Sequence, residues 1–428
     1  MSEKWSDHYT SLMVKKSSLL IQVLIAIVLA LLVGGFSSLN SQILGVPYIQ
    51  LLGFLGQLFL NALTLLVVPL VSSALVQGIS QMGQDKSFAR LGGKTFFFYI
   101  STTFLAVLTG LVAVNLIQPG SLMARPEAID VAAQLAKQPQ NHIEAIGQIL
   151  LKLIPVNIFE AAVHGNMLGI IFFSLLFGFA LAKIGSESSH LLITVIRGIF
   201  NTLMRMTHFL MKAMPLGVFC LVSKAIAIRG FEGISGLLYF FVAVLLGLAV
   251  FMFAILPIFL KLMGVNPWRH LKAMAPALIT AFSTSSSVAA LPVTLECVEK
   301  RAGVSNRISS FVVPLGTSIN LSGSALYECV AVLFIAQVYG FELSVMHQAL
   351  IVLLSLLTSM GVAGIPSGSL VAILIILNAM GFPAEGLALI LPVDRILDMC
   401  RTTVNVFSDA SCAVLVAHTE GEKVLNKP

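Results

Sequence analysis

The stretch Leu387–His418, LALILPVDRILDMCRTTVNVFSDASCAVLVAH, has the pattern of one long apolar helix that carries charges. The charged residues are Asp394, Arg395, Asp398, Arg401 and Asp409. At 100° per residue, five polar positions fall within about 80° of one another on one face: Asp394, Asp398, Arg401, Asn405 and Asp409. A charge within a membrane costs roughly 2.5–3.5 kcal/mol, so these side chains must face protein, a ligand or water. The pattern indicates a binding stripe for a charged solute and its coupling ions, with a ladder of structural ion pairs as the alternative.

The composition is that of a polytopic helical membrane protein. Of 428 residues, 57% are hydrophobic and 10% are charged, and the mean hydropathy is +0.97, whereas about a quarter of the residues in a soluble domain are charged. The net charge of +6 does not indicate nucleic acid binding, because the basic residues lie at the ends of apolar segments, as the positive-inside rule describes. The five cysteines have no metal or redox spacing.

Six apolar segments precede Ala273, and each is long enough to cross a bilayer. They cover residues of about 18–36, 49–79, 95–117, 145–184, 191–222 and 233–262. The first has basic residues before it and no small-residue cleavage site, so it is expected to be a span and not a cleaved signal. The loop with Asp85, Lys86, Arg90 and Lys94 is expected in the cytoplasm, as are both termini.

After Ala273 the apolar segments are repeatedly broken by small and polar residues, in two similar units. Each unit has a break rich in Ser or Gly and then a second polar break, and corresponding breaks recur about 80–85 residues apart. Such interrupted segments in two halves are typical of a transporter binding site built from inverted repeats. We therefore expect an all-α polytopic membrane protein with about eight transmembrane helices and two re-entrant helical hairpins, whose tips meet the charged helix.

The residue types at these breaks suit an anionic solute. Small residues allow close approach to the backbone, and free amides and hydroxyls suit a carboxylate, although Ser and Gly runs also serve close helix packing. Arg401 offers a planar fork for a second carboxylate, and Asp398, one turn away, can take an ammonium group. These features describe an acidic amino acid, and without Asp398 a plain dicarboxylate would fit equally well.

A second set of residues offers hard oxygen donors, which suit Na⁺. They are Asn320, Asn405, Asp409 and the backbone near Gly316. The same carboxylate could carry a proton instead.

The chain resembles the glutamate and dicarboxylate:cation symporter family over nearly its whole length, most closely from Ala273 to Glu420. The resemblance rests on TSSS (284–287), PLGTSIN (314–320), GIP (364–366) and DRILDMCRTTVN (394–405). It implies a homotrimer with an elevator mechanism, in which a transport domain moves against a scaffold and the hairpins act as gates. Residues 1–84 and 119–224 are expected in the scaffold, and residues 85–118 and 225–428 in the transport domain.

The resemblance also implies site residues, carried over by position. The substrate contacts would be Ser286, Ser287, Ser324, Ile365, Asp398, Arg401, Thr402 and Asn405. One sodium site would comprise Gly316, Asn320, Asn405 and Asp409. A second would use backbone around Ser359, Met360 and Val362, with Ser318. A third would use Tyr99, Thr102, Thr103, Asn320 and the residue at position 322.

The segment Asn320–Ser324 departs from the family's sodium-coupled pattern. Those members usually read NMDGT where this chain reads NLSGS, so Ser322 replaces an acidic ligand. We therefore expect Na⁺ coupling with fewer ions than the full pattern, and proton coupling through Asp409 or Asp394 is the alternative. Relatives often carry an arginine at the position of Ser285 or of Met399, and both are neutral here, so potassium countertransport is not expected.

These features favour a secondary active symporter for aspartate or glutamate in the cell membrane, with no cofactor beyond its coupling cation. A C4-dicarboxylate substrate remains the alternative. A serine hydrolase using Ser285–Ser287 is disfavoured, because no histidine lies near the broken segments to act as a base. A channel is disfavoured because a sealed site with paired opposite charges fits alternating access better.

Overall fold

The computed structural model is almost entirely helical, as the sequence predicted. It describes residues 21–23, 25–35, 42–43, 46–80, 86–123, 154–163, 167–184, 187–229, 233–341, 343–360 and 368–425. The strands among these residues are β1 (Gln42–Ile43) and β2 (Val46–Pro47), which form one antiparallel pair. Of the predicted site residues, Val362 and Ile365 lie outside the described part of the chain.

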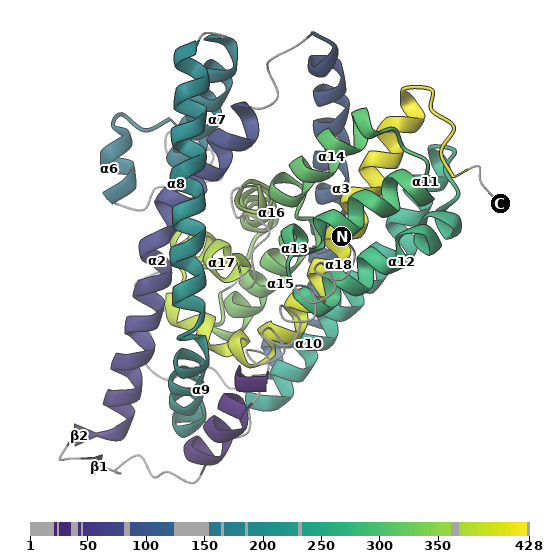
Figure 1. Ribbon diagram of the computed structural model, residues 1–428. Coiled ribbons are helices and arrows are strands. Elements are labelled where there is room, and N and C mark those ends of the chain that lie inside the picture. The colour runs from purple at the N-terminus through teal and green to yellow at the C-terminus, as the bar shows by residue number, and fades with distance from the viewer. Residues whose placement is uncertain are drawn as a thin grey trace, which may run out of the picture.

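One group of helices comes from the first half of the chain. It contains α2 (Tyr48–Ser80), α6 (Ile158–Val163), α7 (Met167–Ile184), α8 (Glu187–Met211) and α9 (Met214–Arg229). Helix α2 packs against α7, α8 and α9, and α2, α7 and α8 run side by side at one side of the molecule (Figure 1). The segment predicted as a single fifth span is two helices, because the α-helical hydrogen bonding ends at Met211 and starts again at Met214.

A second group packs around α15 (Ser322–Val338) and α18 (Leu387–Thr419). It contains α3 (Lys86–Ile117), α10 (Gly233–Val250), α11 (Leu256–Leu262) and the C-terminal helices, with a short π-helical stretch at Phe251–Ile255 joining α10 to α11. A 3-10 turn at Pro119–Leu122 follows α3. Three stretches of the described chain are long and apolar enough to cross a membrane: Arg90–Leu122, Gly236–Leu262 and Asn306–Val338. The most apolar window of the third is fully buried, so this part of the stretch is covered by protein on all sides.

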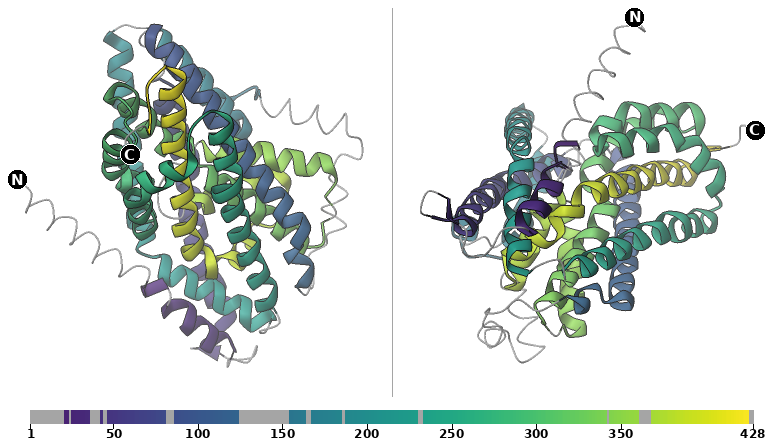
Figure 2. Two further views of the ribbon diagram at one scale, coloured as in Figure 1. Left: turned by 90° about the vertical axis from the view of Figure 1, so that its right-hand side faces the viewer. Right: turned by 90° about the horizontal axis from the view of Figure 1, so that it is seen from below.

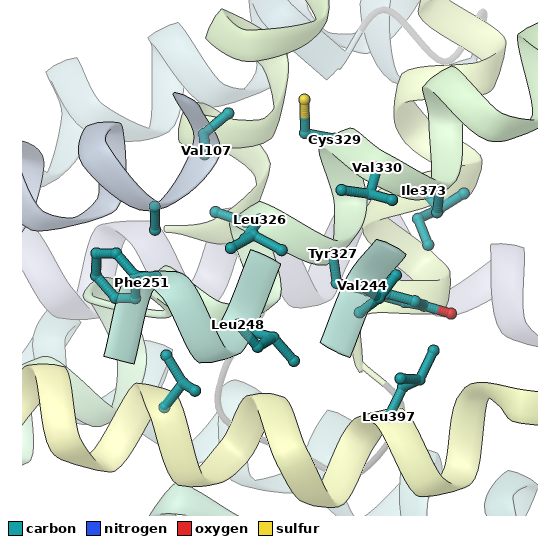
Figure 3. Close-up of a cluster of buried hydrophobic side chains, with 14 of the residues drawn as sticks. Val107, Val244, Leu248, Phe251, Leu326, Tyr327, Cys329, Val330, Ile373 and Leu397 are labelled. Carbon is teal, nitrogen blue, oxygen red and sulfur yellow. The ribbon is translucent and has the colours of Figure 1, made fainter. Parts of the chain in front are cut away.

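Apolar side chains from several helices fill the space around α15. Figure 3 shows Leu326 and Tyr327 of α15 among side chains from α3, α10 and α18. Gly110 and Gly247, from α3 and α10, both lie against Leu326, and a Cβ on Gly110 would come within 3.0 Å of its backbone carbonyl oxygen. This packing holds the polar residues of α15 at a fixed depth between the neighbouring helices.

Helices α12 (Pro267–Thr284) and α13 (Ser287–Glu296) pack against each other on either side of the Ser-rich break. Ser285 in this break has a positive φ of 48°, which reverses the chain, and Ser286 caps α13 by accepting a hydrogen bond from the Ala289 amide at 3.3 Å. A π-helical turn, Cys297–Arg301, extends α13.

The predicted break at Asn320 separates α14 (Asn306–Ile319) from α15 (Ser322–Val338). Asn320 and Leu321 have non-helical backbone angles, with ψ values of 62° and 58°. The backbone groups that leave the helix here are buried, which is tolerated at membrane depth only where protein surrounds them.

The second unit repeats this pattern. Helices α16 (Val345–Ser359) and α17 (Gly368–Met380) pack against each other, and a 3-10 turn (Ala384–Gly386) leads into α18 (Leu387–Thr419). The charged stretch is thus one continuous helix, as predicted. Helix α18 packs against α12 on one side and against α3 and α10 on the other (Figure 2).

The prediction of a basic loop before the third span is wrong in part. Helix α3 begins at Lys86 and includes Arg90 and Lys94. Both side chains pair with Glu420, just after α18, at 2.6 Å each. The hydrogen bond from Lys94, followed by that from Arg90, holds the pKa of Glu420 below its usual value. These contacts join the start of α3 to the end of α18.

Candidate substrate and cation site

Four charged side chains of α18 form a closed, buried network. Arg401 donates from Nη1 to Asp394 Oδ1 at 2.9 Å and from Nη2 to Asp398 Oδ1 at 2.8 Å. Arg395 Nη1 lies 3.2 Å from Asp398 Oδ2. The side chains are at most 5% exposed. Two cations and two carboxylates balance, which avoids the large cost of an isolated charge in a low-dielectric environment.

Tyr327 of α15 ties this network to the unwound segment. Its hydroxyl donates to Asp394 Oδ1 at 3.1 Å, and its ring lies under the Arg401 guanidinium, 4.1 Å from ring centre to Cζ. A cation over an aromatic face is a favourable contact, and it fixes the plane of the guanidinium. Asp394 Oδ2 and Arg401 Nε have no hydrogen-bond partner among the described residues. The network therefore has one buried acceptor, Asp394 Oδ2, and one buried donor, Arg401 Nε, that could bind a ligand.

Asn405 connects α18 to the first turn of α15. Its Oδ1 accepts hydrogen bonds from the amides of Gly323 at 2.7 Å and Ser324 at 3.2 Å, and its Nδ2 donates to Ser324 Oγ at 3.1 Å. A Cβ on Gly323 would lie 2.6 Å from the Arg401 carbonyl oxygen, so only glycine allows this close approach. Asn405 thus caps the free amides that the helix break exposes.

Asn320 is the centre of a second polar cluster, and its Nδ2 donates to Asp409 Oδ1 at 2.9 Å. Gly316 lies directly against this carboxylate, since a Cβ there would be 2.6 Å from Oδ1. The Tyr99 hydroxyl donates to the carbonyl of Val312 on the same helix. Asp409 Oδ2 is buried and has no partner among the described residues. A carboxylate oxygen with free lone pairs, surrounded by amide and hydroxyl oxygens, has the chemistry of a Na⁺ ligand.

The third predicted cation site is a cluster of neutral groups. Asn320 Oδ1 accepts from the hydroxyls of Thr102 and Thr103 at 3.2 Å each and from that of Ser322 at 3.1 Å. Ser322 Oγ also lies 3.1 Å from Thr103 Oγ1 and 3.0 Å from Ser408 Oγ. These hydroxyls contact Asn320 Oδ1 and one another, and the nearby carboxylate of Asp409 bonds to Asn320 Nδ2 and not to the hydroxyls. The structure therefore brings the predicted residues together without a negative charge among them.

Three consecutive serines lie where the chain passes from α12 to α13. Ser285, Ser286 and Ser287 are buried, and the hydroxyls of Ser285 and Ser287 have no partner among the described residues. Helix α13, which follows these serines, also packs against α18, the helix that carries the charged network. Unpaired buried hydroxyls are costly, which is consistent with a position that meets a polar ligand.

The remaining predicted residues lie in the same part of the molecule. Thr402 is buried on α18, Ser318 is half-buried near the end of α14, and Ser359 and Met360 are buried at the end of α16. The Ser359 hydroxyl donates to the carbonyl of Leu356 at 3.0 Å.

The comparisons with known proteins agree with this geometry. A family model described as the sodium:dicarboxylate symporter family matches residues 19–419. The chain belongs to this family. It is 37% identical over 409 residues to the proton/glutamate-aspartate symporter of Escherichia coli (strain K12), covering 95% of this chain and 93% of that protein. It is 36% identical over 410 residues to the proton/sodium-glutamate symport protein of Bacillus caldotenax, covering 95% and 96%. It is 33% identical over 371 residues to a C4-dicarboxylate transport protein of Bacillus subtilis (strain 168), covering 86% and 87%.

Membership of the sodium:dicarboxylate symporter family confirms the prediction of a membrane symporter rather than an enzyme. Three residues of this symporter were nevertheless missed by the sequence reasoning. Arg395 was given no role in substrate binding, Tyr327 was not considered, and Glu328 was overlooked. Glu328 is completely buried on α15, where its Oε2 accepts from Thr358 Oγ1 at 2.9 Å and it forms no ion pair among the described residues. Glu328 is the only charged residue between Ile308 and Val338. Because a charge within an apolar segment is rare and usually functional, the sequence could have singled it out.

Proposed function

We propose that the protein imports aspartate or glutamate together with a coupling cation. The observation that carries this is the buried guanidinium of Arg401, which lies between two carboxylates and on the Tyr327 ring. A fully buried arginine held by contacts that a ligand can replace is suited to a planar, bidentate carboxylate.

The substrate's side-chain carboxylate would pair with Arg401, and its ammonium group would bind Asp398. When Arg401 turns to the substrate, Asp398 and Asp394 each lose one hydrogen bond, and an ammonium group supplies donors in their place. The α-carboxylate would meet Ser286 and Ser287 at the hairpin tip, with Asn405, Thr402 and Ser324 completing the pocket. A contact from Ile365 also belongs to this proposal.

Charge balance explains why a cation accompanies the substrate. The network of two arginines and two aspartates is neutral, whereas aspartate or glutamate brings a net charge of −1. A buried uncompensated charge is costly, so a cation must enter with the substrate. We place this cation at Asp409, with Asn320, Asn405 and the backbone of Gly316, and a second at the backbone of Ser359, Met360 and Val362 with Ser318.

The cluster at Ser322 is proposed to hold a cation poorly. Its predicted ligands Tyr99, Thr102, Thr103, Asn320 and Ser322 include no carboxylate, and an uncharged cage attracts a cation far less in a low-dielectric environment. We therefore favour Na⁺ coupling with fewer ions than a full set of three charged cages would allow.

Proton coupling is the second candidate, and a specific observation favours considering it. Glu328 is a buried carboxyl that forms no ion pair among the described residues, and such a group is accommodated at lower cost with a proton than with a charge. Two relatives are named for protons alone or for protons and sodium together. Glu328 thus joins Asp409 and Asp394 as a possible proton carrier.

We further propose that the protein is a homotrimer of the plasma membrane with cytoplasmic termini, working by an elevator motion. The helices α2 and α7–α9 would form the scaffold, and α3 and α10–α18 the transport domain, with two re-entrant hairpins among about eight spans. The support is that α2 packs chiefly against α7, α8 and α9, whereas α3 and α10 pack chiefly against α15 and α18 (Figure 1).

Two substitutions test the substrate assignment in proteoliposomes. Arg401→Ala should weaken aspartate binding by about 2–5 kcal/mol, or roughly 30- to 4,000-fold, whereas the exposed Arg301→Ala should have no effect. Asp398→Asn should weaken aspartate binding and spare succinate. Unchanged aspartate affinity in both site variants would refute the proposal.

Uptake under separately imposed Na⁺ and H⁺ gradients tests the cation. Accumulation driven by Na⁺ at equal pH supports the sodium assignment. Accumulation driven only by a pH gradient, in the absence of Na⁺, would transfer the coupling to a proton.

A further inference from the structure

Asp398 lies between two arginines that use different oxygens of its carboxylate. Arg401 reaches Oδ1 at 2.8 Å from three residues ahead, and Arg395 reaches Oδ2 at 3.2 Å from three residues behind. Residues three apart on a helix are neighbours on its surface, so both contacts are compatible with a regular α18. The two arginines therefore differ in their partners: Arg401 also pairs with Asp394, whereas Asp398 is the only carboxylate within ion-pair distance of Arg395 among the described residues.

This difference matters when a substrate enters. If Arg401 turns to a substrate carboxylate, Asp398 keeps its second guanidinium, because Arg395 holds the opposite oxygen. Asp398 then faces the substrate as one half of an ion pair and not as a bare negative charge.

We propose that Arg395 is a positioning residue that sets how well this transporter tolerates dicarboxylates without an amino group. The inference rests on the proposed function, in which Asp398 binds the substrate ammonium. Succinate carries two negative charges and no ammonium group, so a bare Asp398 carboxylate would repel it. Paired with Arg395, the same carboxylate repels it less and still accepts hydrogen bonds from the ammonium group of aspartate.

The burial of Arg395 makes this effect strong. The residue is 4% exposed, so solvent does not screen its charge as it would on a surface. Loss of the charge should weaken binding of the divalent anion more than that of the monovalent amino acid, which gains a stronger contact between its ammonium group and Asp398.

The test is the ratio of the inhibition constant of succinate to that of aspartate, measured by competition for labelled aspartate uptake by the full-length protein in proteoliposomes. Arg395→Gln should raise this ratio at least tenfold, with aspartate affinity changed less than threefold. Arg395→Lys keeps the charge and should keep the ratio within threefold of the wild type. The exposed Arg301→Gln is the matched control for removing one positive charge elsewhere.

Arg395→Met gives a second test if the glutamine variant does not fold, since it removes the charge and leaves no unpaired polar group. An unchanged or lowered ratio in the variants that lack the charge would overturn the inference. Equal losses of succinate and aspartate affinity would also overturn it, because they would indicate a purely structural role. The double variant Arg395→Gln with Asp398→Asn should return the ratio toward that of Asp398→Asn alone.

The failure of this inference can be told apart from that of the proposed function. If Asp398→Asn weakens aspartate selectively and Arg395→Gln leaves the ratio unchanged, only the role of Arg395 is refuted. If Asp398→Asn leaves aspartate binding intact, the ammonium assignment fails, and the inference fails with it.

Discussion

Gly316→Ala should weaken cation binding at Asp409 without touching the substrate site. The new Cβ would lie 2.6 Å from Asp409 Oδ1, 2.7 Å from its Cγ and 3.1 Å from the Tyr99 hydroxyl, whereas ordinary contacts begin at 3.4 Å. The carboxylate oxygen must therefore retreat by 0.8 Å, the difference between 2.6 Å and 3.4 Å. A retreat of that size along the bond from Asn320 Nδ2, now 2.9 Å, would stretch it to 3.7 Å, beyond hydrogen-bonding range.

The magnitude follows from the loss of one hydrogen bond to a buried charged group. Such a bond contributes about 1.5–3 kcal/mol, so cation affinity should fall roughly 10- to 150-fold. Aspartate binding should then require a correspondingly higher Na⁺ concentration and recover when Na⁺ is saturating, because the contacts of Arg401 and Asp398 are unchanged.

The assay is calorimetric titration of aspartate at a series of fixed Na⁺ concentrations. Gly93→Ala in α3 is the control, because a Cβ at that position would meet nothing within 4 Å. An Na⁺ dependence identical to that of the wild type would refute the assignment of Asp409 to the cation. Aspartate affinity that stays low at all Na⁺ concentrations would instead show that the substitution distorts the unwound segment.

Three further predictions concern Tyr327 in the charged network, Ser322 in the uncharged cage and Glu420 after the end of α18. Tyr327→Phe removes the hydroxyl that donates to Asp394 but keeps the ring, so aspartate affinity by calorimetry should fall by about 1–3 kcal/mol; a loss below twofold would mean that only the ring matters. Ser322→Asp restores a carboxylate to the uncharged cage, so the slope of aspartate affinity against Na⁺ concentration should rise by about one ion, and an unchanged slope would contradict the charge argument. The hydrogen bond from Lys94 is the main cause of the lowered pKa of Glu420. The ion pairs of Glu420 therefore stabilise the fold fully above its unfolded pKa of 4.5. This contribution is lost as the pH falls through the lower pKa of the folded state. Glu420→Gln should lower thermal stability in detergent by at most about 1 kcal/mol near neutral pH and remove this acid dependence, and a wild-type profile in the variant would show that the pairs contribute nothing.

The helical face of α18 could be predicted because its pattern is local. Asp394, Asp398, Asn405 and Asp409 recur at helical spacing, and all of them are buried toward neighbouring helices. Arg395 was not predicted as part of this face because its Cα lies outside it, and only the end of its long side chain reaches Asp398. A periodicity argument places Cβ atoms and not the far ends of flexible side chains.

The positions where the helices are interrupted could also be predicted from the sequence. The chain reversal at Ser285 and the interruption at Asn320 were placed correctly, since Ser, Gly and Asn favour caps and non-helical backbone over the helix interior. The single fifth span was wrong, because a continuous apolar pattern does not record a short change of direction between two helices.

What the sequence determined by itself is the all-helical class, the breaks at Ser285 and Asn320 and the polar face of α18, because these depend on neighbours within a few residues. What only the tertiary structure decided is which polar groups meet. Asn320 with Asp409, Tyr327 with Asp394, and Asn405 with Ser324 are each separated by more than 60 positions in the chain. Their pairing depends on how far α15 is inserted between α3 and α18, and a shift of one residue would rotate its side chains by about 100°. That depth is set by close packing of side chains, such as Leu326 against Gly110 and Gly247, which no local pattern encodes.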